Sequence, residues 1–305
     1  MKRTIEVSTK GMSLRVHDKC IEVRFNNDLC CRVHPEDLNL VVLGSNGVSV
    51  SAGALNALAT AGVGMLSVDD KSQPNGLFLP FWSNSTHAER YRMLAATPEP
   101  VAKQLWAKIV AQKILNQSLV LSGEAEQRFL RRLSGEVKTG DATNLESQAA
   151  QYYWPRAFAK HIKEPFRRKP DGAPPNGLLN YGYAILRAAM ARAICIAGMQ
   201  PSLGIHHRNK YARFCLADDL MEPFRPYVDR IVLGLLADNK SEMDKEAKQR
   251  LLHVLSKDVF CGKEHFLLSY MIEKTASSFA DCIAQKYKDK ISAKQAASHL
   301  LLPRG

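Results

Sequence analysis

The sequence contains no long hydrophobic run. Apolar stretches such as Ile231–Ala237 are far shorter than the roughly 20 residues that a membrane-spanning helix needs. The first residues, Met1–Glu6, carry a basic pair with no apolar segment behind it, which predicts that no secretory signal is present. We therefore expect a cytoplasmic protein that makes no membrane contact.

The sequence also lacks any Cys-x-x-Cys motif. Its seven cysteines are an odd number, which indicates reduced, mostly buried thiols rather than a disulfide framework. Cys261, His265 and His253 lie near one another in the sequence but fall short of the four ligands of a structural zinc site. A Walker phosphate-binding loop is absent as well, so nothing indicates a P-loop nucleotide hydrolase.

The positive charge is unevenly distributed. The chain has 42 Lys and Arg against 30 Asp and Glu, a formal net charge of +12. Residues 1–90 hold nine side chains of each sign, so the whole excess lies in residues 91–305. A basic part beside a neutral one indicates a polyanionic partner such as DNA. A general solubility charge is the alternative, and charge alone barely separates the two.

The hydrophobic period changes near Thr86. Before it, alternating stretches such as Cys20–Phe25 predict strands, and the Asn-Gly pair between Leu40–Leu43 and Val48–Val50 predicts a tight hairpin. After it, apolar stripes predict helices at 100–121, 124–137, 144–154, 178–198, 214–222, 227–237, 241–256 and 263–286. We therefore predict an α+β protein: a small, mostly antiparallel β domain (1–85) followed by a larger all-α domain (86–305).

A basic loop interrupts the helical part. Residues 164–175 contain four prolines, which lack the N–H donors that a helix needs. Arg167, Arg168 and Lys169 follow one another in this segment. We expect them to lie on an exposed loop and to contact phosphates, with a solvated surface as the alternative.

Two segments offer isolated candidates for chemistry. Glu146 lies on a predicted helix of small, amide and aromatic residues, although Thr143–Glu146 also fits a capping box in which this carboxylate closes the helix end. His206 and His207 follow Gly204 in a predicted loop, where a histidine pair is a candidate ligand set or simply surface.

A third segment brings carboxylates together. Asp218 and Asp219 lie four and three residues before Glu222, so their side chains converge on one helix face. Such like charges repel unless a cation neutralises them, and a solvated acidic patch is the alternative. Combined with Glu146 and one imidazole, they form a set that suits Mg²⁺ or Mn²⁺. In basic surroundings this set predicts metal-assisted phosphodiester transfer.

The order of these motifs resembles that of the CRISPR-associated integrase family. The motifs are Glu146 with Tyr153-Trp154, Asn180–Leu186, Gly204–His207 and Asp219–Pro226, while Leu105–Val110 and Lys113–Gln117 resemble the type II branch. The similarity runs from the first strands to about residue 230. It implies an N-terminal β-sandwich followed by a C-terminal α-helical catalytic domain.

The resemblance implies specific metal ligands. It assigns Glu146, His207 and Glu222 as the catalytic residues that bind Mg²⁺ or Mn²⁺. His207 is chosen over His206 because the family's histidine is the fourth residue counting from a glycine such as Gly204. Glu222 stands where the family often has Asp, which leaves Asp219 as an added or water-mediated ligand. Near these residues, Arg208, Lys210 and Arg225 are expected to contact phosphates.

The resemblance also implies a function in antiviral defence. The chain is expected to be a DNA endonuclease and integrase that inserts spacers into a CRISPR array by 3′-hydroxyl attack. The expected partners are double-stranded DNA (spacer precursor and CRISPR repeat), a second copy in a homodimer, and a small second adaptation protein, with the effector nuclease as a further candidate. The alternatives are a nonspecific DNA-binding scaffold without catalysis and a metal-dependent phosphohydrolase of small esters, which would prefer an enclosed pocket.

Overall fold

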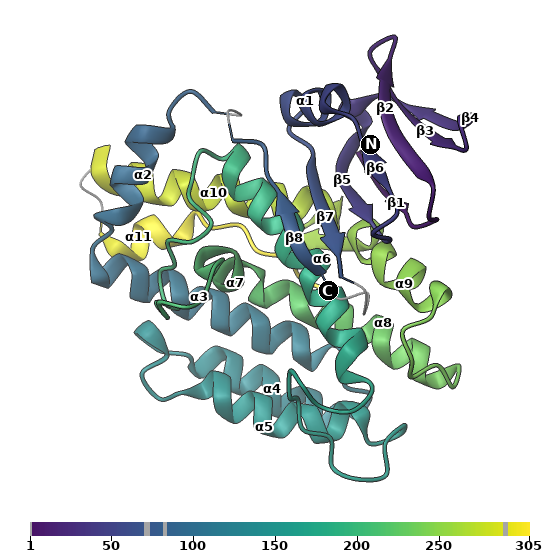
Figure 1. The fold of residues 1–305 in the computed structure, drawn as a ribbon. Coiled ribbons are helices and arrows are strands. Elements are labelled where there is room, and N and C mark those ends of the chain that lie inside the picture. The colour runs from purple at the N-terminus through teal and green to yellow at the C-terminus, as the bar shows by residue number, and fades with distance from the viewer. Residues whose placement is uncertain (1, 70–73, 82–83, 289–291) are drawn as a thin grey trace.

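The structure, a computed structural model, describes residues 2–69, 74–81, 84–288 and 292–305. The N-terminal strands form a small lobe beside a larger helical body (Figure 1). The strands of this lobe end at β8 (Pro74–Phe78), and the first long run of helices begins at α2 (His87–Ala95). The α+β class expected from the change of period is confirmed, whereas the domain boundary at residue 85 stays a prediction.

The N-terminal lobe contains two four-stranded sheets. The first has the order β1 (Arg3–Val7), β5 (Leu38–Leu43), β7 (Gly64–Val68) and β8. The second has the order β4 (Asp28–Val33), β3 (Cys20–Phe25), β2 (Met12–His17) and β6 (Ser49–Val50). A short helix, α1 (Ala52–Thr60), begins after Ser51, whose hydroxyl accepts a hydrogen bond from the amide of Ala54.

The predicted hairpin between β5 and β6 is wrong. These strands lie in different sheets, because β5 pairs in parallel with β1 and β7, while β6 pairs in parallel with β2. Residues 38–42 of β5 are all buried, and a strand with both faces covered takes a central position between parallel neighbours. The lobe is therefore mixed rather than mostly antiparallel.

The first sheet is shared by two hydrophobic cores. Val41 and Met65 pack with the second sheet and α1 in the smaller core. Leu40, Val42 and Leu66, which point to the opposite face, belong to the core of the helical body. Helix α6 packs against this face (Figure 1).

The helical body follows the predicted periodicity closely. Its remaining helices are α3 (Glu99–Ser118), α4 (Glu124–Glu136), α5 (Leu145–Phe158), α6 (Asn176–Ile196), α7 (Cys215–Met221), α8 (Arg225–Ala237), α9 (Lys245–Leu252), α10 (Leu268–Lys288) and α11 (Ala293–Ser298). Helix α6 is buried along most of its length. A Cβ at Gly182 would lie 2.4 Å from Val228 Cγ1, so glycine permits the close approach of α6 to α8. None of the described helices is long and apolar enough to cross a membrane.

One hairpin departs from the all-α prediction. Strands β9 (Asp258–Cys261) and β10 (Glu264–Leu267) pair around Gly262, whose φ of +63° favours glycine. The helix predicted from residue 263 therefore starts only at Leu268. Backbone hydrogen bonds between Phe260 and Arg304 add the C-terminal segment to the edge of this hairpin. They give the backbone N–H and C=O groups of Phe260 the partners that a helix would otherwise provide.

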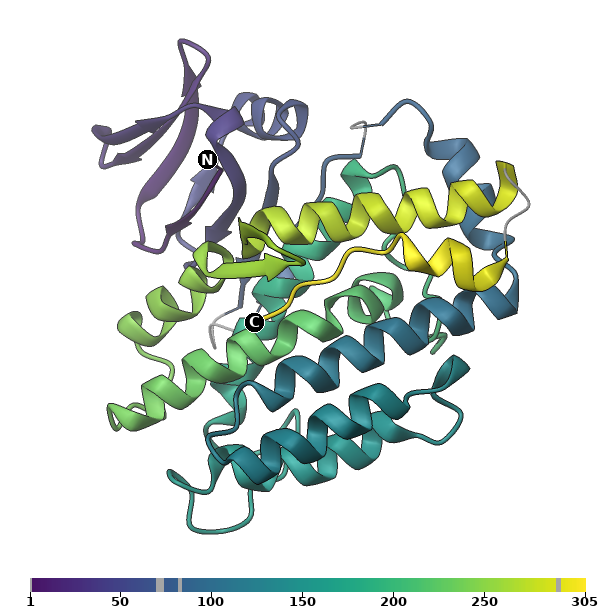
Figure 2. The same cartoon turned by 180° about the vertical axis from the view of Figure 1, so that it is seen from behind.

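The C-terminal segment supports the turn that carries Glu222. After α11 it runs back between α10 and α8 (Figure 2). The buried side-chain amide of Asn116 on α3 donates to the carbonyls of Pro223 (2.7 Å) and Pro303 (3.0 Å). The side chain of Asn116 thereby ties the 3₁₀ turn η3 (Glu222–Phe224) to helix α3 and to the C-terminal segment.

Candidate active site

The predicted carboxylates meet at Lys113 on helix α3. Glu146 comes from the first turn of α5, and Glu222 from η3 between α7 and α8. The Nζ atom of Lys113 lies 2.6 Å from Glu146 Oε1 and 2.5 Å from Glu222 Oε2. Two carboxylates from different helical segments therefore share one ammonium group, and this lysine was not among the predicted site residues.

Glu222 is an ionised carboxylate in the protein interior. Only 4% of the residue is exposed, and Arg225 Nη2 lies 2.9 Å from its Oε1 atom. Burial raises the pKa of this carboxyl, but Arg225 and Lys113 outweigh burial and lower it overall. The Oε2 atom is buried, and the ammonium of Lys113 is its partner. Both oxygens of Glu222 are therefore paired with cationic side chains.

Glu146 does not close its own helix. Asp141 caps α5 instead, because its carboxylate accepts from the amides of Leu145 (2.8 Å) and Glu146 (3.0 Å). Asn144 adopts the left-handed conformation at the cap position and makes no side-chain capping bond. The capping box considered for Glu146 is thus absent, and its carboxylate points to Lys113 instead.

His207 is held by a buried carboxylate. Asp219, fully buried on α7, accepts hydrogen bonds from the amides of Ile205 (2.8 Å), His206 (3.0 Å) and His207 (3.2 Å). Its Oδ1 atom also lies 2.5 Å from His207 Nδ1. This bond raises the pKa of His207 despite the opposing effect of burial. It places a proton on Nδ1 and leaves Nε2 as the nitrogen for a ligand, the arrangement of metal-binding histidines.

The hydrogen bonds to Asp219 also concern the prediction that this residue is an added metal ligand. Both of its oxygens already accept hydrogen bonds from the loop, so the geometry favours a role in positioning His207. Gly204 makes this arrangement possible. A Cβ there would lie 2.3 Å from the carbonyl oxygen of His207 and 3.0 Å from Asp219 Oδ2. Metal binding by Asp219 stays a prediction.

The two histidines have different surroundings. His206 lies flat on the buried ring of Trp106, with centroids 4.0 Å apart and an angle of 3° between the planes. Burial lowers the pKa of His206. His207 meets the same ring edge-on at 5.5 Å and carries the bond to Asp219. This difference favours His207 over His206 as the ligand.

The predicted phosphate contacts are of two kinds. Arg167, Lys169, Arg208 and Lys210 are exposed. Arg168 is half-buried and donates to the side chains of Asn176 (2.8 Å) and Asn180 (2.5 Å), which anchors the basic loop to α6. Arg225 faces the interior, beside Glu222 and over the ring of Tyr183. As predicted, no helix forms across residues 164–175.

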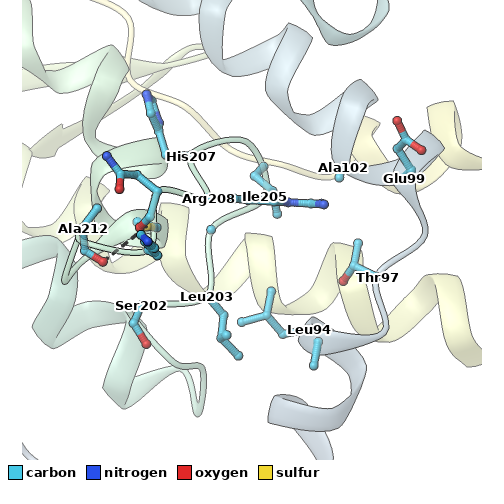
Figure 3. Close-up of a pocket in the computed structure, with 15 residues that line it drawn as sticks. Leu94, Thr97, Glu99, Ala102, Ser202, Leu203, Ile205, His207, Arg208 and Ala212 are labelled. Carbon is cyan, nitrogen blue, oxygen red and sulfur yellow. Dashed lines mark hydrogen bonds between the residues drawn. The ribbon is translucent and has the colours of Figure 1, made fainter.

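A cavity of about 560 Å³ opens beside His207 (Figure 3). Loop residues Ser202–Ala212 form one wall, and residues from the end of α2 to the start of α3 form the other. Arg208 and Lys210 contribute positive charge, and Leu94 and Leu203 contribute apolar surface. The cavity therefore combines charged side chains, among them Glu99, with apolar surface.

A buried polar network lies behind the carboxylates. The hydroxyls of Tyr153 (2.8 Å) and Tyr183 donate to Asp229, a fully buried residue of α8. Burial raises the pKa of Asp229 to about 6. Arg225 joins this network to Glu222 by stacking on Tyr183 at 4.8 Å. Both tyrosines were part of the sequence motifs, but their shared partner had not been recognised.

The donor set fits a divalent cation, although the carboxylates are engaged. Among the described residues, no three His, Cys, Asp or Glu side chains stand ready as a metal-binding group. Lys113 Nζ takes the position between Glu146 and Glu222. Two carboxylates and an imidazole are the kinds of ligand that suit Mg²⁺ or Mn²⁺. The residues therefore fit such a metal once the ammonium moves.

Comparison with known proteins identifies the family. Residues 5–260 match the family model of the CRISPR associated protein Cas1. The chain belongs to the Cas1 family. The CRISPR-associated endonuclease Cas1 of Neisseria meningitidis serogroup C (strain 8013) is 35% identical over 273 residues, which cover 88% of this chain and 86% of the relative. The resemblance inferred from the motifs is confirmed, and with it an enzyme of the CRISPR-associated endonuclease type.

Solved structures share the fold. A casposase bound to an integration product aligns with a TM-score of 0.72 at 20% identity, over 96% of this chain and 93% of the casposase. A chain of a Cas6-RT-Cas1–Cas2 complex aligns with a TM-score of 0.75 at 17% identity. That alignment covers 99% of this chain but only 36% of the longer chain. These matches confirm the α+β architecture.

Proposed function

We propose that this chain is a metal-dependent DNA endonuclease and integrase that joins the 3′-hydroxyl ends of short duplexes to a CRISPR repeat. The observation that carries the proposal is that Glu146 and Glu222 meet at Lys113, and that both carboxylates are close enough to His207 to raise the pKa of its imidazole. The Cas1 family match and a fold shared with a casposase bound to an integration product support the same reaction.

Each side chain of the site has a separate task in this proposal. Glu146, Glu222 and His207 Nε2 hold Mg²⁺ or Mn²⁺, with the imidazole favouring Mn²⁺. When bound, such an ion withdraws charge from the scissile phosphate and lowers the barrier to attack by a hydroxyl. Asp219 keeps the imidazole oriented and its Nδ1 protonated. Arg225 keeps Glu222 ionised, which a ligand must be.

Exposed cations bind the DNA backbone. Arg167, Lys169, Arg208 and Lys210 lie at the surface of the chain's basic part, and Arg208 and Lys210 also line the cavity beside His207. In this arrangement they contact phosphates, whereas Arg168 fixes the loop that presents two of them. An integrase needs this extended contact because its substrate is a polymer, whereas a phosphohydrolase of small esters does not.

The proposed assembly contains a second copy of the chain and a small second adaptation protein. The Cas6-RT-Cas1–Cas2 complex has a chain of the same fold beside Cas2, which supports the second partner. For the homodimer, β4 is an edge strand whose backbone is open to pairing, with Leu29 exposed on it. Light scattering tests the dimer: a monomer at micromolar concentration contradicts it. The effector nuclease and the cytoplasmic location stay predictions.

The function is tested by a pair of histidine variants. His207→Ala is expected to abolish Mn²⁺-dependent joining of a 3′-hydroxyl duplex to a repeat-containing plasmid, because it removes a ligand from a half-exposed position. His206→Ala is the matched control, since its ring packs on Trp106 and against the ring of His207 but makes no bond to Asp219. Joining that survives in His207→Ala contradicts the proposal. DNA binding without any metal-dependent joining by the wild type would favour a scaffold instead.

A further inference from the structure

The carboxylate pair is already neutralised by two cations. Glu146 and Glu222 contribute two negative charges, and Lys113 and Arg225 contribute two positive ones. Only 14% of the Lys113 side chain is exposed, so solvent screens these pairs weakly. Before any metal binds, this group of four side chains therefore carries no net charge.

A metal ion and the Lys113 ammonium compete for one position. The Nζ atom lies within 2.6 Å of an oxygen from each carboxylate. A bridging divalent cation would stand at about 2.0–2.2 Å from the same oxygens. Both cannot be accommodated, so metal binding requires Lys113 to leave at least one carboxylate. Leaving is costly unless another anion receives the ammonium, because an unpaired buried charge is unfavourable.

We propose that Lys113 couples metal binding to DNA binding. In the free protein its ammonium holds Glu146 and Glu222 together. When DNA enters, a phosphate receives the ammonium, and the two carboxylates become available to the metal. The inference rests on the proposed function and assigns Lys113 as a positioning residue of that site.

Charge balance makes this coupling reciprocal. A divalent ion adds two positive charges to a neutral group, and the phosphates of bound DNA offset them. DNA must therefore strengthen metal binding by the same factor by which metal strengthens DNA binding. An alternative is that Lys113 only ties α3 to α5 and η3. In that case its removal lowers stability but leaves metal affinity and coupling unchanged.

The experiment measures Mn²⁺ affinity with and without DNA. Mn²⁺ is titrated into the wild type alone and with a duplex whose ends lack the 3′-hydroxyl, so that no joining occurs. We expect the duplex to strengthen Mn²⁺ binding to the wild type roughly tenfold or more. Lys113→Met is expected to bind Mn²⁺ several-fold more tightly than the wild type when DNA is absent, with little further gain from DNA. Lys113→Arg keeps the charge and should retain the coupling.

Lys103 provides the matched control. It lies on the same helix, is half-exposed and pairs with Glu99 rather than with Glu146 or Glu222, so Lys103→Met should leave the Mn²⁺ affinity measured without DNA unchanged. Thermal melting in EDTA checks that each variant is folded. If Lys113→Met does not fold, the titrations of the wild type test the proposal by themselves. A wild-type Mn²⁺ affinity that the duplex does not change overturns the coupling. A folded Lys113→Met that binds Mn²⁺ no more tightly than the wild type overturns it as well. No Mn²⁺ binding under any condition refutes the proposed function itself.

Discussion

Asp219→Asn separates a residue that positions the histidine from one that binds the metal. The carboxylate accepts hydrogen bonds from three loop amides and from the imidazole of His207. An asparagine has one acceptor oxygen, and its amide nitrogen must face backbone N–H groups that also donate. In either orientation of this amide two donors lose their acceptor: the amides of Ile205 and His206 at one oxygen, or the amide and ring of His207 at the other.

The expected cost follows from those two donors. A buried donor left without a partner costs about 1–3 kcal/mol, so Asp219→Asn should lower the free energy of unfolding by roughly 2–6 kcal/mol. The loss is expected in EDTA, because it comes from the loop and not from the metal. Joining should fall together with stability, since His207 loses the group that orients it.

The assay is urea unfolding in EDTA beside Mn²⁺-dependent joining. Asp218→Asn is the control, because Asp218 is adjacent but pairs with the partly exposed Arg187, and should change stability by about 1 kcal/mol or less. An Asp219→Asn protein that is as stable as the wild type in EDTA and loses only metal binding would refute the positioning role. Asp219 would then be the ligand that the sequence left open.

Three further variants test other parts of the structure. Glu146→Gln should abolish joining because the side chain loses the charge that holds a cation. It should lower the unfolding free energy in EDTA by only about 1 kcal/mol, since the partly exposed amide can still accept from Lys113. Near-normal joining would contradict the assignment of Glu146 as a metal ligand. Arg167→Ala with Lys169→Ala should reduce the slope of log affinity against log salt by about 2 in DNA-binding titrations, and an unchanged slope means a solvated surface. Burial raises the pKa of Asp229 to about 6 in the folded state. Between about pH 4 and 6 the folded protein therefore keeps this proton, whereas the unfolded chain has lost it. This group should therefore lower the unfolding free energy of the wild type by about 3 kcal/mol as pH rises through that window, and Asp229→Asn should lack this loss. The unfolding free energy is measured by chemical denaturation at several pH values. The same pH dependence in both proteins would contradict the prediction.

Local periodicity was sufficient for the helices but not for strand pairing. A stripe of apolar residues with the helical period predicts both a helix and its buried face from local sequence alone. For this reason α4 and α6 begin and end within two residues of the prediction. The partners of a strand depend on distant segments. The Asn-Gly pair after β5 therefore indicated a hairpin, whereas parallel pairing with β1 and β7 covers both buried faces.

The candidate site was only partly visible in the sequence. Residue type and spacing offered Glu146, a histidine pair and a carboxylate cluster as candidates, and the family resemblance selected Glu146, His207 and Glu222 among them. No spacing rule shows that a buried carboxylate such as Asp219 binds the amides of a distant loop. Lys113 left a weak signal, because a lysine next to Ile114 on the buried face of α3 needs buried partners. Which carboxylates supply them depends on the packing of α5 and η3.

The sheet shared by two cores has a consequence for folding. A chain cut between β8 and α2 would leave Leu40, Val42 and Leu66 facing water on one side of the first sheet. The helical body would in turn lose the apolar wall against which α6 packs. Neither half is thus expected to be soluble alone, and the two should melt in a single cooperative transition. A calorimetric scan of the intact chain should show one endotherm, with a ratio of van't Hoff to calorimetric enthalpy near one.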